Sequence, residues 1–233
     1  MDMPDMPGIS SVLVVLAIAL GLNNLISVLL LNYFYSRSPQ PDRAYLRYCM
    51  VYYLCAIGGY IAYLSRTFYS PGLSVFLTNV FAMMAACAVL FAFQSRFQNK
   101  AHPWRSWWLL YPFLVAAIAS FFLYRYPDKL ILRSVNLYIH SAFVYLTALF
   151  VTTGVAPRKK GFNTTLLSFG VLGLILLSFI IPVVGAGGLE PMLRHSVILC
   201  IQIVATQIIL ATFLVGLLHH RSDSGRDNRP GDS

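Results

Sequence analysis

Seven apolar segments, each long enough to cross a lipid bilayer, divide this chain of 233 residues. A membrane-spanning α-helix needs about 20 apolar residues. In lipid every backbone N–H and C=O must find a partner within the protein, and these segments lack the alternating pattern of barrel strands, so all seven predict α-helices. The expected spans are Ser11–Tyr35, Ala44–Leu64, Leu73–Phe93, Trp107–Tyr124, Leu132–Val155, Thr164–Gly185 and Met192–Leu218.

The composition supports a membrane class, with 58% hydrophobic and 11% charged residues against about 25% charged in an ordinary soluble domain. We expect an all-α, polytopic bundle over residues 1–220, followed by a disordered cytoplasmic tail over residues 221–233. The four cysteines lie in apolar segments without metal-type spacing, which is typical of small buried side chains rather than disulfides or ligands. They are Cys49, Cys55, Cys87 and Cys200.

The distribution of Lys and Arg predicts the orientation, because these residues prefer cytoplasmic loops. Twelve of the 17 Lys and Arg residues lie on one side of the expected bundle, the side that holds the C-terminal tail. The N-terminal segment before the first span has no Lys or Arg. An N-out, C-in arrangement follows. Tryptophans at the start of the fourth segment predict an interfacial belt at that helix end.

The net charge of +9 does not predict a nucleic-acid partner, because the basic residues flank apolar segments rather than forming one patch. The expected neighbour is the lipid bilayer, with anionic headgroups near the basic loops. The basic residues of the outer loops have two interpretations. They could hold an anionic ligand, or they could simply be charges in contact with solvent. The outer basic residues are Arg66, Arg125, Lys129, Arg133, Arg194 and His195.

A candidate ligand pocket is predicted on the fifth segment, where His140, Asn136 and Arg133 follow one another about one helical turn apart. Ionisable groups inside a membrane are costly and usually face the bundle interior or a wet cavity. An outward-opening pocket, with Asn79 of the third segment as a further member, is one interpretation. The alternative is a histidine hydrogen-bonded to a neighbouring helix.

Other polar groups within the spans predict helix-to-helix hydrogen bonds. Asn23 and Asn24 lie in the first segment, and Gln202 and Thr206 share one face of the seventh. Pro182 should remove a backbone hydrogen bond and bend the sixth helix. Gln202, Thr206 and Pro182 are therefore candidates for coupling helix movement to the cytoplasm.

Several activities are disfavoured by the residues present. The seventh segment has no lysine for a retinal Schiff base, and every carboxylate, Asp42 included, is expected in a tail or loop, which argues against an ion pump. Hydrolase, metalloprotease and phosphate-loop motifs do not occur. We expect a protein that is not an enzyme and has no cofactor or metal site.

The stretch from Ala44 to Phe97 resembles the seven-helix membrane input region found ahead of many bacterial GGDEF-type diguanylate cyclases. The likeness lies in an aromatic and basic helix start (Tyr45, Arg47, Tyr48), central glycines (Gly58, Gly59), an outer turn with Arg66 and Pro71, Asn79, and the exit "QSRF" before "WWLLYP". The resemblance implies a sensory bundle in a bacterial inner membrane. No G-G-D-E-F string occurs in the chain, so the output is expected from a separate domain or partner.

The sequence therefore predicts a sensory or regulatory module that passes an external or membrane-borne cue to a cytoplasmic signalling protein. A small carrier or lipid-handling protein is the first alternative, and a membrane scaffold subunit is the second. The ligand, whether an anionic lipid or a small molecule, and the oligomeric state, a homodimer among the alternatives, stay open.

Overall fold

The computed structural model describes residues 11–65, 70–98, 107–126, 130–154, 162–186, 197–198 and 200–215. Over these residues the chain is all-helical and contains no strand. The predicted tail over residues 221–233 lies outside the described residues, as do most of the basic loop residues used to predict the orientation.

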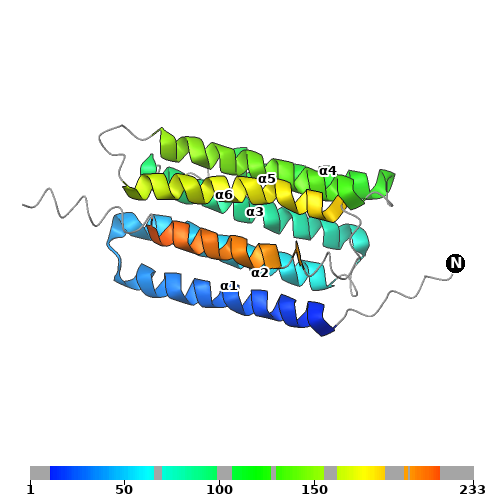
Figure 1. Cartoon of the computed structure of the whole chain (residues 1–233), viewed down its shortest axis with the longest axis horizontal. Helices are drawn as coiled ribbons and strands as arrows, with labels where there is room; N and C mark the ends of the chain where they lie inside the picture. The colour runs from blue at the N-terminus through cyan, green and yellow to red at the C-terminus, as the bar shows by residue number, and fades with distance from the viewer. Residues whose placement is uncertain are drawn as a thin grey trace, which may run out of the picture.

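Long helices lie side by side in a bundle (Figure 1). Each predicted span overlaps one of them, and their ends differ from the predictions by several residues. In chain order the helices are α1 (Ser11–Arg37), α2 (Gln40–Leu64), α3 (Pro71–Phe97), the short 3₁₀ helix η3 (Trp107–Leu109), α4 (Tyr111–Arg125), α5 (Leu130–Thr153) and α6 (Phe162–Ala186), followed by a helix over Cys200–Val215, here called the C-terminal helix.

Four of these helices are long and apolar enough to cross a membrane. They are α1, α3, the η3–α4 unit and α5, while α6 and the C-terminal helix contain shorter apolar stretches among the described residues. The helix α2 is the least apolar of the six α-helices. The reason is its sequence, which carries Asp42, Arg43 and Arg47 in its first turns and many tyrosines beyond them.

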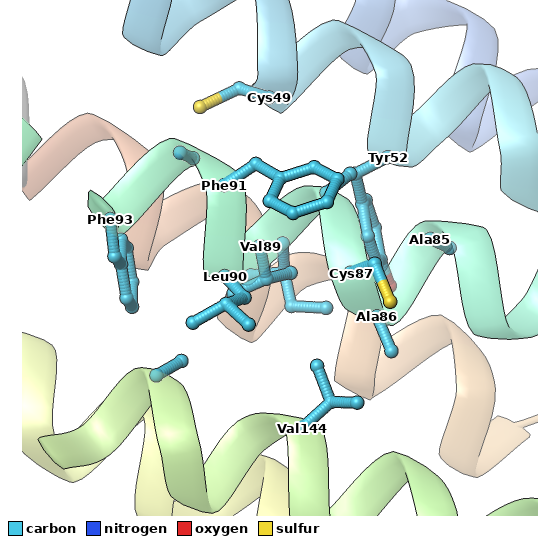
Figure 2. Close-up of a cluster of buried hydrophobic side chains, with 14 of the residues drawn as sticks. Cys49, Tyr52, Ala85, Ala86, Cys87, Val89, Leu90, Phe91, Phe93 and Val144 are labelled. Atoms are coloured by element: carbon cyan, nitrogen blue, oxygen red, sulfur yellow. The ribbon is translucent and has the colours of Figure 1, made fainter. Parts of the chain in front are cut away.

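Helix α3 forms the centre of the bundle and packs against α2, α4 and α5. Its stretch from Ala85 to Phe93 is buried throughout, and four of those nine residues are alanines. Small side chains let neighbouring helices approach closely. Figure 2 shows the consequence, with Cys49 and Tyr52 of α2 on one side of this stretch and Val144 of α5 on the other.

The starts of α3 and α4 follow the usual local rules. The Ser70 hydroxyl accepts a hydrogen bond from the Leu73 N–H at 3.4 Å, which satisfies one of the donors that a helix start leaves open. Proline stands in the first turn of both helices, where its missing N–H costs nothing.

Helix α4 begins part of the way along α3 rather than level with its end. The Cys87 thiol donates to the Trp108 carbonyl at 3.7 Å, and Cys87 stands ten residues before the end of α3, a rise of about 15 Å. Trp108 is buried, whereas Trp107 is exposed. The ring of Trp108 therefore packs within the helix bundle, and its place in an interfacial belt stays a prediction.

The position of Asp42 corrects one prediction. Asp42 was expected in a loop, but it lies in the first turn of α2 and is fully buried. Helix α2 begins at Gln40, four residues before the predicted span. A hydropathy pattern could not extend the helix over these residues, because a charged residue becomes tolerable there only through a partner on another helix.

Candidate functional site

The predicted pocket residues His140 and Asn136 both contact α4. The Tyr111 hydroxyl and His140 Nδ1 lie 2.5 Å apart in a hydrogen bond, and the Asn136 amide donates to the Val115 carbonyl at 3.3 Å. Each pair joins one residue of α5 to one of α4, and the second pair lies four residues later on α4 and four residues earlier on α5. These four residues define what we call the α4–α5 seam.

Aromatic rings surround the histidine end of this seam. The Tyr111 ring meets the His140 ring edge-on, with centroids 5.5 Å apart, and Trp108 stacks against Trp107 at 4.2 Å. Phe143 extends the cluster, with its ring 5.9 Å from that of Trp108. His140 is partly exposed, so its imidazole lies in a mainly apolar wall with one hydroxyl partner.

Arg133 lies one helical turn from Asn136, and Asn79 lies near the seam on α3. Arg133 is half-buried on α5, and it interacts with another group of the protein. The Asn79 amide donates to the Val75 carbonyl of its own helix at 2.7 Å, while its side-chain oxygen is buried without a partner. The Ser141–Met83 contact between α5 and α3 sets a register in which Asn79 is level with Asn136.

A hollow at the surface lies between the start of α3 and the end of α4. It is lined by Ser70, Gly72, Leu123 and Tyr124. None of the predicted pocket residues lines this hollow. The outer residues Arg66, Lys129, Arg194 and His195 lie outside the described residues.

A second group of polar contacts holds the C-terminal helix against α2. The hydroxyls of Tyr45 and Tyr53 donate to the backbone carbonyls of Phe213 and Thr206 at 2.9 Å and 2.8 Å. Tyr60 donates to the Gln202 side-chain oxygen at 3.1 Å. Together with the contacts of Asn23 with Thr206 and Gln207, these bonds define what we call the C-terminal seam.

Asn23 ties α1 to the same helix. Its amide donates to the Thr206 hydroxyl at 3.1 Å, and its side-chain oxygen accepts from the Gln207 amide. The adjacent Asn24 is fully buried, yet neither of its side-chain polar atoms has a partner. One asparagine of the pair therefore links helices, and the other does not.

The seam also comes close to α5 at Gln202, whose side chain lies near that of Tyr138. Tyr138 and His140 are two residues apart, so they project from nearly opposite faces of α5. One of them faces the C-terminal helix and the other faces α4. Helix α5 therefore lies between the two seams.

The role of the α2 tyrosines is not predicted from the sequence, although their spacing is a signal for it. Tyr45, Tyr53 and Tyr60 are eight and seven residues apart, a spacing that places them on one face of a helix. A hydropathy pattern treats these rings only as aromatic and apolar groups. Their hydroxyls are the part that marks the contact with the C-terminal helix.

A buried ion pair joins Arg96, near the end of α3, to Asp42, near the start of α2. The Arg96 Nη1 atom donates to Asp42 Oδ1 at 2.6 Å, and the two side chains are 7% and 1% exposed. Each partner keeps one buried polar atom without a hydrogen bond, Asp42 Oδ2 and Arg96 Nη2. The Arg96 guanidinium also stands 5.8 Å from the centre of the Tyr45 ring.

Pro182 lies within α6, which continues to Ala186, and its side chain lies outside what the structure describes. The bend expected there stays a prediction. Comparison of the chain with protein-family models, with curated proteins and with solved structures finds no match.

Proposed function

We propose that this chain is a sensory or regulatory module of a bacterial-type inner membrane, with seven spans, the N-terminus outside and the C-terminus in the cytoplasm. Four helices with the length and apolar character of spans support the membrane location. The helices α2, α6 and the C-terminal helix would supply the other three. The orientation rests on the 12 of 17 Lys and Arg residues on one side.

The observation that carries this proposal is the way the C-terminal helix is held. Five hydrogen bonds join it to α1 and α2, and its backbone carbonyls accept two of them. Interhelical hydrogen bonds in membrane proteins contribute about 0.6 kcal/mol each on average. A helix held by several weak, directional contacts can change position when a ligand favours a second arrangement by a modest free energy.

The input side of the proposed module is the α4–α5 seam. A ligand or lipid group that replaced the Tyr111 hydroxyl as the partner of His140 would change the packing of α5 against α4. Because Tyr138 projects from the other side of α5 toward Gln202, a rotation of α5 would disturb the C-terminal seam. This chain of contacts is a physical route between two sites, as coupling requires.

Photo-crosslinking in native membranes tests the proposal. A photo-activatable residue would replace Arg226 in the unmodified chain, in Tyr53→Phe and in a control, Tyr33→Phe. Tyr53→Phe removes one hydrogen bond to the C-terminal helix, whereas the Tyr33 hydroxyl bonds only within α1. We expect one main protein adduct, whose yield changes by about threefold in Tyr53→Phe and not in the control.

Two results would overturn the sensory function. One is an adduct pattern and yield that are identical in all three chains. The other is the absence of any protein adduct together with solute flux through liposomes that contain the purified chain, which would favour a carrier.

A further inference from the structure

The outward face of the C-terminal helix carries a regular stripe of exposed residues. These are Cys200, Val204, Gln207 and Ala211, at intervals of four, three and four residues. That spacing places them in one line along a helix and is the seam pattern of left-handed helix pairs. In Figure 1 the helix, coloured orange, runs along α2 with α1 beneath it.

Gln207 is the polar member of this stripe. Its amide N–H donates to the Asn23 side-chain oxygen, and its own side-chain oxygen has no hydrogen bond among the described residues. Gln207 lies level with Asn23, near the middle of α1, and with Tyr53, near the middle of α2. The free oxygen is therefore exposed at mid-depth in the bundle.

Lipid tails cannot satisfy that oxygen. In the hydrocarbon region a polar group without a partner costs free energy, and exposed hydroxyls of this chain avoid the cost locally. The Thr147 hydroxyl, for example, donates to the Phe143 carbonyl of its own helix. The Gln207 oxygen has no such local donor, because the backbone N–H groups of its helix are engaged along the helix.

A second copy of the chain fits this face. A primary amide offers both an acceptor and a second N–H donor, so two Gln207 side chains related by a two-fold axis can bond to each other. All copies insert into the membrane with the same orientation, which makes the axis perpendicular to the membrane and brings each stripe residue close to its own counterpart. Ala211 and Cys200 are small enough to allow close approach.

We infer that the chain forms a parallel homodimer through the stripe of Cys200, Val204, Gln207 and Ala211, with the two Gln207 amides hydrogen-bonded at mid-membrane. This inference does not depend on the sensory function, because a carrier or scaffold could use the same pairing. It identifies one helix as both the dimer interface and the element held by the C-terminal seam.

The native cysteines provide the first test. A disulfide requires Cα atoms about 4.4 to 6.8 Å apart, and Cys200 is exposed on the stripe while Cys49, Cys55 and Cys87 are buried. Mild oxidation of native membranes should give a covalent dimer that Cys200→Ser abolishes. In the Cys200→Ser chain, Val204→Cys should restore it, whereas Leu176→Cys on the exposed face of α6 should not.

The role of Gln207 is tested by two matched substitutions in the chain with Cys200. Gln207→Leu removes the amide and should lower the dimer yield by about fivefold. Asn23→Leu breaks the same intramolecular bond but leaves the Gln207 amide in place, and should retain the dimer. Asn32→Leu, at an exposed position on α1, controls for a general gain in apolar surface.

Three outcomes would overturn the inference. Val204→Cys could fail to crosslink, or Leu176→Cys could crosslink equally well. A photo-activatable residue at position 204 could also give only adducts with a different protein, which would assign the stripe to another partner.

Discussion

Arg96 and Asp42 form an ion pair across the α2–α3 interface, at 2.6 Å and with both side chains nearly excluded from the surface. The pair joins the last turn of α3 to the first turn of α2. It therefore fixes the end of α3 to the start of α2, at the side of the bundle that is cytoplasmic in the proposed orientation.

Removing one partner of this pair should destabilise the bundle strongly. Asp42→Ala leaves the Arg96 guanidinium buried without its carboxylate, a change that costs about 3 to 5 kcal/mol. The double variant Asp42→Ala with Arg96→Met should recover much of the loss, because an apolar pair carries no desolvation cost. Unfolding in mild detergent, followed by tryptophan fluorescence, measures both, with the exposed Arg47→Gln as control. A double variant no more stable than Asp42→Ala would contradict this account.

The neighbouring asparagines of α1 should respond differently to the same truncation. Asn23→Ala loses hydrogen bonds to Thr206 and Gln207 and should lower the free energy of unfolding by about 1 kcal/mol. Asn24→Ala removes an amide that has no partner, so the relief of a buried unsatisfied group should offset the lost packing. Detergent unfolding of the two variants is the measurement. Equal losses in both would show that Asn24 has an unrecognised partner.

The contact between α6 and the C-terminal helix depends on Gly170. A Cβ atom at this position would overlap the buried Thr212 hydroxyl, so Gly170→Ala should destabilise by about 1 to 3 kcal/mol. Gly173→Ala, with no atom within 4 Å of the added Cβ, should be neutral or slightly stabilising, because alanine favours the helix. Adding Thr212→Ala to Gly170→Ala should restore stability. Melting temperatures in detergent test the three variants.

The Tyr111–His140 hydrogen bond should appear as an energetic coupling between α4 and α5. Tyr111→Phe removes only the hydroxyl that contacts Nδ1, and His140→Phe removes the other partner. In a double-mutant cycle the coupling should be about 0.5 to 1.5 kcal/mol. The same cycle with Ser120→Ala in place of Tyr111→Phe is the control, because Ser120 bonds to its own helix. A coupling near zero would mean that the contact contributes nothing to helix packing.

The sequence by itself determined the class of architecture. Long apolar segments can satisfy their backbone in lipid only as helices, and each predicted span corresponds to a helix of the structure. The polar character of Asn23, Gln202 and Thr206 also indicated contacts between helices. These inferences depend only on segment length and residue type, which can be read along the chain.

The tertiary structure alone decided which face of each helix points inward. In a soluble helix the apolar stripe marks the buried side, but in a membrane the lipid-facing side is equally apolar, so periodicity carries little information about direction. Whether Asn23 or Asn24 bonds to the C-terminal helix, and whether Gly170 or Gly173 lies against Thr212, depends on helix rotation. The pairing of Asp42 with Arg96 depends on register between two helices, which no linear pattern contains.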